Sequence, residues 1–506
     1  MGFEVRSSTV DVSSIGVLAV AAALFFMLTG SVALGFEYLG YPSPDEQVAA
    51  TFMKRVRDGL PLPIPEQLSE TLENILHPRS TTVVNSTIVP QGFPLQMVLW
   101  GTLSRITHLP YPLFTPLLGA LALPLLFPLF QLSFSSRVAF FVALLSMVHP
   151  AVLYYTSRGL YSNAPQLFLL IIALYFFTRN TRGRWLFGGA LLGVAVALRP
   201  SELIWIAPML LVFAWWSSGS LSRANVSLAF LAFSLIGFGV LLYQRNLYGG
   251  ALLGYSFSSA ASVIVGDSWS LEAVRKHAQA YLLSLLWWWT IPAVGGAFLF
   301  LRTPRDRQAP RRRYAILAFL VTAVLLLFYG SWNLRDTVSE EGITIGTSFV
   351  RYWLPIFILT LPLTAVGLIS LQLPRVVVSF FVFVSLLYPT VWGFESLAHN
   401  LKQARANQTI LKRAKQRLPP DAVLLVERSD KIFWPEYRVI SGETEQQKVR
   451  LILPKVLGRA PLYFHRSSEL AFGSFWNEEH LAKVGLRFGP AIQLDALNEL
   501  LPIQPL

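Results

Sequence analysis

Two adjacent carboxylates, Asp45 and Glu46, stand in a Tyr-Pro-Ser-Pro-Asp-Glu-Gln run near the start of the chain. Pro42 and Pro44 each fix a backbone φ angle and remove a backbone donor. They therefore predict a stiff, non-helical presentation of Asp45 just before a helix over residues 46–58. A carboxylate held in this way can act as a general base. Asp45 can equally be the N-cap of that helix, a common and purely structural use of aspartate.

Three arginines stand at the borders of apolar segments, namely Arg158, Arg199 and Arg351. An ionisable side chain close to hydrocarbon is costly and by default indicates a functional partner, and the planar guanidinium matches the oxygens of a phosphate. For Arg199 the alternative is an ion pair with nearby Glu202. For Arg158 and Arg351 the alternative is anchoring or snorkelling at the membrane interface.

Composition indicates a polytopic membrane protein. The chain has 506 residues, of which 54% are hydrophobic and only 14% charged. Its net charge of +13 comes from Arg and Lys in short segments between apolar runs, as the positive-inside rule expects, so no nucleic-acid partner is implied. The absence of cysteine excludes a thiolate metal site or a cysteine nucleophile. No Walker A, GxGxxG, HExxH or GxSxG motif occurs.

Hydropathy divides the chain into apolar segments, and we expect successive segments to cross the bilayer in opposite directions. Residues 92–106 are short and contain Arg105, so we expect them not to span fully, which leaves about eleven transmembrane helices. Basic runs at 179–184 and 302–313 mark the inside, which places the N-terminus in the cytoplasm. The twelve segments are residues 15–35, 92–106, 112–132, 138–155, 164–177, 185–198, 201–216, 226–243, 281–301, 314–330, 349–371 and 376–392.

Two domains are expected. Residues 1–393 form the multi-span domain, which includes a large external loop over residues 36–90 that is too long for a simple connector. Residues 394–506 are water-soluble in character and predict a small external α/β domain, with a strand at 422–427. The polar candidates all lie in segments assigned to the outside, so we expect the chemistry on the non-cytoplasmic face of the cell membrane.

The candidate motifs, taken in order, resemble the GT-C superfamily of membrane glycosyltransferases. The resemblance is to the protein O-mannosyltransferase and aminoarabinose-transferase-like branch, family 39. It covers roughly residues 15–392. The matching elements are Asp45-Glu46 after the first span, Gly-Phe-Pro-Leu from residue 92, Ser157-Arg158, Leu198-Arg199-Pro200, Asn246 to Tyr255, and Arg351-Tyr352 with Pro355.

The resemblance implies an enzyme that moves a sugar from a polyprenyl-phosphate donor to an acceptor hydroxyl on a protein, lipid or glycan. It implies that Asp45 is the general base. It also implies that Arg351, with Arg158 or Arg199, stabilises the lipid phosphate as it leaves. Membrane lipids are the remaining partners, and no nucleotide cofactor is implied.

Four further residues enter the expected site through the same resemblance. Glu46 either orients the target of Asp45 or binds a divalent cation, and no other metal site is expected. Asn246 and Tyr255 have side chains that suit sugar hydroxyls, although both are equally typical of ordinary loop and belt positions. Tyr352 is counted with the phosphate site.

Two other classes remain open from the sequence. A secondary transporter or lipid flippase predicts inverted repeats and acidic residues at midplane depth, and neither is found. A non-catalytic membrane assembly or receptor protein would leave the Asp45 loop free to vary. Replacing Asp45 distinguishes all three, because only the enzyme loses turnover.

Overall fold

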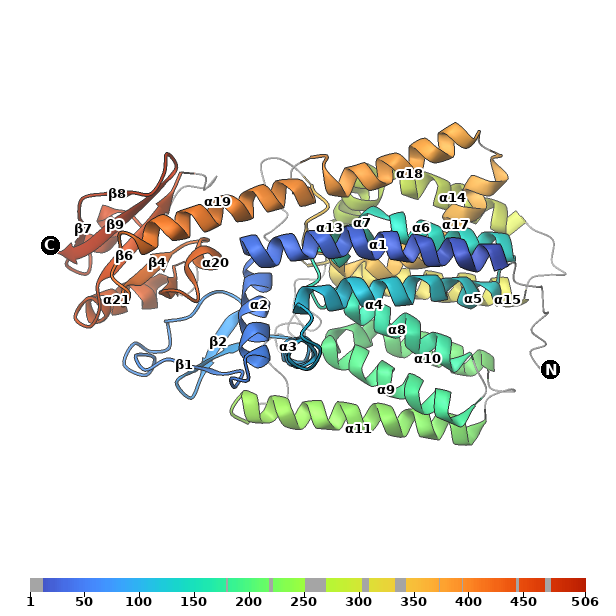
Figure 1. The fold of residues 1–506 in the computed structure, drawn as a ribbon, viewed down its shortest axis with the longest axis horizontal. Coiled ribbons are helices and arrows are strands. Elements are labelled where there is room, and N and C mark those ends of the chain that lie inside the picture. The colour runs from blue at the N-terminus through green and yellow to red at the C-terminus, as the bar shows by residue number, and fades with distance from the viewer. Residues whose placement is uncertain are drawn as a thin grey trace. The chain divides into compact units, whose positions relative to one another are not determined.

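The computed structural model divides the chain into two compact units (Figure 1). We name them the membrane unit, Met1–Leu34, Pro112–Leu242 and Phe257–His399, and the loop–sheet unit, Gly35–Tyr111, Tyr243–Ser256 and Asn400–Leu506. The residues described are 12–178, 181–217, 222–250, 270–302, 309–332, 343–372, 374–393, 395–442, 446–468 and 475–506.

All regular elements among the described residues of the membrane unit are helices, because a bilayer requires every backbone polar group to be paired within its own segment. Short 3₁₀ or π segments (η) join several of the helices. Its elements, four of which (α1, η1, α11 and α19) include residues of the other unit, are α1 (Val12–Leu39), η1 (Tyr111–Leu113), α4 (Phe114–Ala122), η2 (Leu123–Leu125), α5 (Leu126–Gln131), α6 (Ser136–Val148), α7 (Pro150–Ser157), α8 (Asn163–Phe177), α9 (Arg182–Leu198), η3 (Pro200–Glu202), α10 (Leu203–Ser217), α11 (Arg223–Leu247), α13 (Leu271–Ala278), η4 (Gln279–Leu285), α14 (Trp287–Arg302), α15 (Ala309–Gly330), α16 (Ser348–Tyr352), α17 (Leu354–Ser370), α18 (Arg375–Thr390) and α19 (Leu397–Lys415).

The chain is a multi-pass membrane protein, but the expected eleven spans are not confirmed. Within the described residues, four helices are long and apolar enough to cross a membrane, or up to seven if each bent pair counts as one span. Three shorter apolar helices, α8, α17 and most of α18, have 15 to 17 residues. At 1.5 Å per residue such helices reach only about 25 Å, less than a full hydrocarbon core.

Prolines account for two of the bends. Pro150 separates α6 from α7 at an angle of 48°, and Pro200 separates α9 from the helix that follows it at 112°. Proline lacks an N–H group and disfavours helical geometry in the residue before it, so each helix ends there. These breaks place Arg199 at a turn between helices, and Arg158 at the C-cap of the short helix α7.

Glycines allow α14 and α17 to cross at close range. A Cβ added to Gly296 would lie 1.8 Å from the carbonyl oxygen of Leu363, and one added to Gly367 would lie 2.2 Å from that of Pro292. Small residues at a helix crossing bring two backbones into contact, which is how apolar helices gain packing energy in lipid.

The loop–sheet unit combines residues from both ends of the chain. Its three-stranded antiparallel sheet has the order β1-β3-β2, and its six-stranded mixed sheet has the order β5-β4-β6-β9-β7, with β8 paired to β9. The elements are α2 (Pro44–Arg57), β1 (Ile64–Pro65), β2 (Thr81–Val84), β3 (Thr87–Pro90), α3 (Pro94–Thr107), β4 (Val423–Val426), α20 (Asp430–Phe433), β5 (Arg438–Ser441), α21 (Gln446–Leu457), β6 (Leu462–Ser467), α22 (Glu478–Ala482), β7 (Leu486–Phe488), β8 (Ile492–Gln493) and β9 (Asn498–Pro505).

The external loop and the C-terminal sheet share one hydrophobic core. Leu72, Ile75 and Leu76 of the loop are buried against residues of β4, β5 and α21. The carboxylate of Glu66 pairs with Arg438 of β5 at 3.2 Å. The boundary expected at residue 394 stays a prediction. The structure adds that residues 35–111 and the C-terminal region fold together.

Candidate functional site

Asp45 lies in the first turn of α2, one residue after Pro44. The helix begins at Pro44, because proline suits the first helical position, and Ser43 is the N-cap. Asp45 is therefore not the cap, and the expected helix over residues 46–58 begins two residues earlier. The side chain of Asp45 is half-buried and accepts a hydrogen bond of 2.5 Å from the Ser80 hydroxyl.

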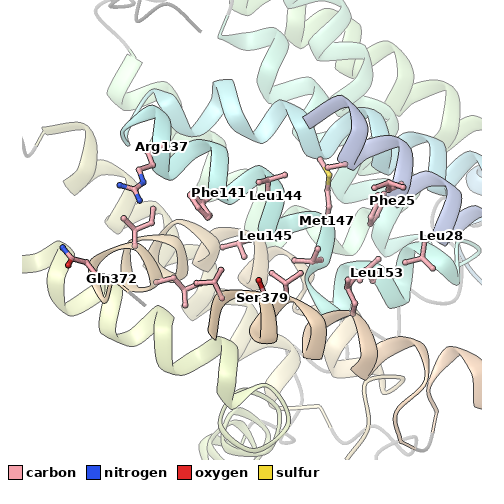
Figure 2. Close-up of a pocket in the computed structure, with 18 residues that line it drawn as sticks. Phe25, Leu28, Arg137, Phe141, Leu144, Leu145, Met147, Leu153, Gln372 and Ser379 are labelled. Carbon is pink, nitrogen blue, oxygen red and sulfur yellow. The ribbon is translucent and has the colours of Figure 1, made fainter. Parts of the chain in front are cut away.

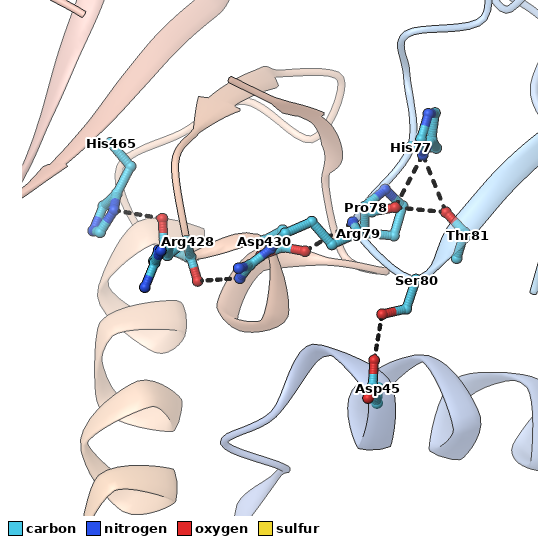
Figure 3. Close-up of polar contacts among 10 residues, drawn as sticks. Asp45, His77, Pro78, Arg79, Ser80, Thr81, Arg428, Asp430 and His465 are labelled. Atoms are coloured by element: carbon cyan, nitrogen blue, oxygen red, sulfur yellow. Dashed lines mark hydrogen bonds and ion pairs between the residues drawn. The ribbon is translucent and has the colours of Figure 1, made fainter. Parts of the chain in front are cut away.

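The segment that carries Ser80 is hydrogen-bonded to the C-terminal region through Arg79 (Figure 3). The backbone N–H of Arg79 donates to Asp430 Oδ2 at 2.9 Å, and its guanidinium donates to Asp430 Oδ1. Arg79 Nη2 also donates to the carbonyl of Arg428 at 2.8 Å. A line of contacts thus runs from Asp45 through Ser80 and Arg79 to Asp430. No sequence pattern predicts these contacts, because the partners are 35 and 351 residues apart.

Glu46 is fully buried next to Asp45. Burial holds the pKa of nearby Tyr41 well above its usual range, with Glu46 among the minor contributors. Tyr41 therefore stays protonated and donates to Glu37 at 3.1 Å. Among the residues that the structure describes, no group of three or more His, Asp or Glu is placed to hold a metal ion.

In the membrane unit the three expected arginines are interleaved with two tyrosine rings. The guanidiniums of Arg158 and Arg351 lie 5.4 Å and 4.7 Å from the ring centre of Tyr161. Those of Arg351 and Arg199 lie 5.2 Å and 5.3 Å from the ring centre of Tyr352. We call these five residues the arginine–tyrosine cluster. It gathers side chains from the segment at Arg158, from the break at Arg199 and from residues 351–352, which the sequence alone had indicated as separate sites.

Hydrogen bonds fix the outer members of the cluster. Arg158 is buried and donates to the hydroxyl of Tyr154 at 2.9 Å. Arg351 donates to Ser348 at 2.9 Å. Because α16 ends immediately before Trp353, Arg351 belongs to a five-residue helix rather than to a continuous span over 349–371.

Arg199 forms the ion pair that was one of its two expected alternatives. Its Nε lies 3.0 Å from Glu202 Oε1, and both side chains are buried. The same carboxylate accepts from the Tyr329 hydroxyl at 2.6 Å and from Trp205 at 2.5 Å. Tyr329 stacks on Tyr352 with ring centres 4.4 Å apart. Glu202 thus holds the side chains of Trp205 and Tyr329 in place, and Tyr329 in turn supports the Tyr352 ring of the cluster.

The remaining expected residues are not brought to either group of contacts. Asn246 lies in the last turn of α11 and is exposed. Tyr255 lies outside the described residues. The neighbouring Tyr248 is buried and donates to the carbonyl of Pro90 at 2.9 Å. This contact joins the end of α11 to β3 within the loop–sheet unit.

The membrane unit contains two apolar cavities. One of about 890 Å³ lies among α1, α6, α7, α17 and α18, with Arg137 and Gln372 at one end and Phe25 and Leu28 at the other (Figure 2). The other, of about 270 Å³, includes Trp205 in its wall. Trp205 thus lines this smaller cavity with its ring and donates to Glu202, the ion-pair partner of Arg199.

Comparison with known proteins gives a family match over part of the chain and a shared fold. Residues 101–243 match the model of a family described as dolichyl-phosphate-mannose-protein mannosyltransferase. The fold is similar to that of ArnT from Cupriavidus metallidurans bound to undecaprenyl phosphate. The TM-score is 0.51 at 12% identity, over 95% of this chain and 97% of that one. It is also similar to the apo oligosaccharyltransferase of Archaeoglobus fulgidus, with a TM-score of 0.50 at 13% identity, over 92% and 71% of the two chains.

No curated protein sequence matches the chain. The chain nevertheless shares its fold with ArnT and with the Archaeoglobus fulgidus oligosaccharyltransferase, and at the level of the fold the resemblance expected from the sequence motifs is confirmed. The family match is confined to residues 101–243.

Proposed function

We propose that the chain transfers a sugar from a polyprenyl-phosphate donor to an acceptor hydroxyl on the non-cytoplasmic face of the membrane. The observation that carries the proposal is the arginine–tyrosine cluster. Glu202 pairs with Arg199, while the guanidiniums of Arg158 and Arg351 lie against the same ring of Tyr161, so an anion bound beside that ring is attracted by two positive charges. A phosphate suits the site, because guanidinium groups match its oxygens in geometry and charge.

The chemistry follows from the two groups of residues. Asp45 takes the proton of the acceptor hydroxyl as its oxygen attacks the anomeric carbon of the sugar. The bond between that carbon and the phosphate oxygen breaks, and the polyprenyl phosphate leaves with the bonding electrons. Arg351 and Arg158 stabilise the negative charge that grows on this phosphate.

The apolar cavity beside Trp205 suits part of the isoprenoid chain. Its wall is almost wholly aliphatic and aromatic, and Trp205 in that wall donates to Glu202, the ion-pair partner of Arg199. A carrier lipid whose phosphate lies at Arg351 would place the first units of its chain against such a surface. Burial of that chain contributes about 0.8 kcal/mol per CH₂ group to binding.

Kinetics of Arg351→Lys and Asp45→Asn test the proposal. Lysine keeps the charge but loses the planar fork, so Arg351→Lys raises KM for the donor about 10-fold or more. Asp45→Asn lowers kcat about 10²- to 10⁴-fold with little change in KM. The probe is undecaprenyl phosphate that carries radiolabelled mannose. Donor movement across the membrane without sugar transfer would favour a flippase instead.

A further inference from the structure

Ser80 stands between the proposed base and the C-terminal region. It donates to Asp45 on one side, and its neighbour Arg79 is bound to Asp430 on the other (Figure 3). We propose that Ser80 is a positioning residue for Asp45 and that Asp430 holds it in place, so that the C-terminal region is part of the catalytic apparatus. This inference rests on the proposed role of Asp45.

The backbone of Ser80 supports this role. Its φ angle is +62°, in the left-handed region that non-glycine residues rarely occupy. Such a conformation persists only where the surroundings impose it, and it clusters at functional sites. Here the carbonyl of Ser80 accepts from the N–H of Gln91 at 2.9 Å, while the preceding N–H, that of Arg79, donates to Asp430. These two contacts hold the peptide unit that follows Ser80 and the peptide unit that precedes Arg79.

Asp430 is well suited to impose that geometry. It is 1% exposed, and it accepts from both the backbone and the guanidinium of Arg79. Bonds between ionised partners are stronger and more directional than neutral ones. The contact fixes main chain rather than only a side chain. A change at Asp430 therefore acts on the position of the Ser80 hydroxyl.

The Ser80 hydroxyl favours the charged form of Asp45, because a donor to a carboxylate stabilises its ionised state. Other charged or titratable groups near this contact include Glu46 on α2, His77 and Arg79 on the loop, Arg428 just before α20 and Asp430 in α20. All of them remain when Ser80 is changed. Removal of the hydroxyl alone should therefore move the acid limb of the rate profile to higher pH.

The Glu66–Arg438 pair provides a matched control. It joins the same loop to the same sheet at 3.2 Å, but neither residue contacts Asp45 or Ser80 in the bonds described. Glu66→Gln should reduce stability in the way that loss of any such tether does. It should leave the pH profile unchanged.

The test compares Ser80→Ala, Ser80→Gly, Asp430→Asn and Glu66→Gln in the full-length protein. Initial rates with mannosyl undecaprenyl phosphate are measured between about pH 4 and 9. Both Ser80 variants should lower kcat about tenfold and move the acid limb up by about half to one pH unit. Glycine adopts a φ of +62° without strain, so agreement of the two variants assigns the effect to the lost hydroxyl.

Asp430→Asn should change the profile in the same direction, and the Ser80→Ala/Asp430→Asn double variant should be no worse than Ser80→Ala alone. A native profile in Ser80→Ala, or full additivity in the double variant, overturns the inference. So does an equal shift in Glu66→Gln. Native turnover in Asp45→Asn would instead refute the proposed base, which separates the two failures.

A second measurement needs no substrate. Trypsin cleaves after arginine, and the Asp430 contact should protect the Arg79–Ser80 bond. Cleavage at this bond, mapped by mass spectrometry, should be several-fold faster in Asp430→Asn than in the native protein, and unchanged in Glu66→Gln. Equal cleavage rates in all three would show that Asp430 does not hold the segment.

Discussion

Glu202→Gln should destabilise the membrane unit strongly. The Arg199–Glu202 pair has side chains only 6% and 3% exposed, so the arginine depends on this carboxylate for compensation of its charge. Removing one partner of a buried pair costs about 3–5 kcal/mol, because the other charge stays buried. Glutamine keeps one acceptor oxygen, which limits the further loss at the Trp205 and Tyr329 donors to about 1 kcal/mol each.

Thermal unfolding in detergent, followed by tryptophan fluorescence, measures this cost. A loss of that size lowers Tm by roughly 10 °C. The matched control is Glu272→Gln, an exposed acid in the first turn of α13, which should stay within about 0.5 kcal/mol of the native protein. A Glu202→Gln protein as stable as this control would refute the assignment of Glu202 as the stabilising partner of Arg199.

The double variant Arg199→Leu/Glu202→Leu separates structure from function. It removes both charges together, and apolar replacements of a buried pair are often tolerated, so it should be more stable than Glu202→Gln. If the folded double variant retains sugar transfer, Arg199 serves only the fold. Loss of transfer in a folded double variant would give Arg199 a part in donor binding as well.

Three further outcomes are expected. Gly296→Ala should destabilise the α14–α17 crossing by about 1–3 kcal/mol, because its Cβ meets the backbone of Leu363. The Gly295→Ala variant should keep its stability, because a Cβ added to Gly295 has no atom within 4 Å. Thermal unfolding compares the two variants. Burial lowers the pKa of His465 to about 4, below about 6.5 in the unfolded chain. The unfolded chain therefore binds the proton first, and stability that is complete above about pH 6.5 falls by up to about 3 kcal/mol towards pH 4. Denaturant unfolding at several pH values should show this slope in the native protein and lose it in His465→Gln. Tyr248→Phe should cost about 1 kcal/mol through loss of the bond to Pro90, measured in the same way.

Elements with strong local signals could be predicted from the sequence. The strand expected at 422–427 appears as β4, and the helix expected at 46–58 appears as α2, displaced by the preference of Pro44 for the first helical position. The break at Arg199 was also visible, since proline ends a helix locally. These features depend on a few neighbouring residues, and a single sequence contains that information.

Contacts between distant segments could not be predicted. The burial of Leu72 and Ile75 against the C-terminal sheet joins residues about 350 positions apart, and no periodicity marks it. The Asp430–Arg79 contact was missed for the same reason. The number of spans stays unconfirmed, because hydropathy detects apolar stretches but not the bends that divide them, such as the 100° turn before Trp287.

The most direct test of the central claim is transfer of radiolabelled mannose from mannosyl undecaprenyl phosphate, in membranes that contain the native chain, Asp45→Asn or Asp58→Asn. Asp58 is an exposed acid at the opposite end of α2 and serves as the matched control. We predict transfer by the native and Asp58→Asn proteins and a loss of about 10²-fold or more in Asp45→Asn. Equal transfer by all three would contradict the assignment of Asp45 as the base.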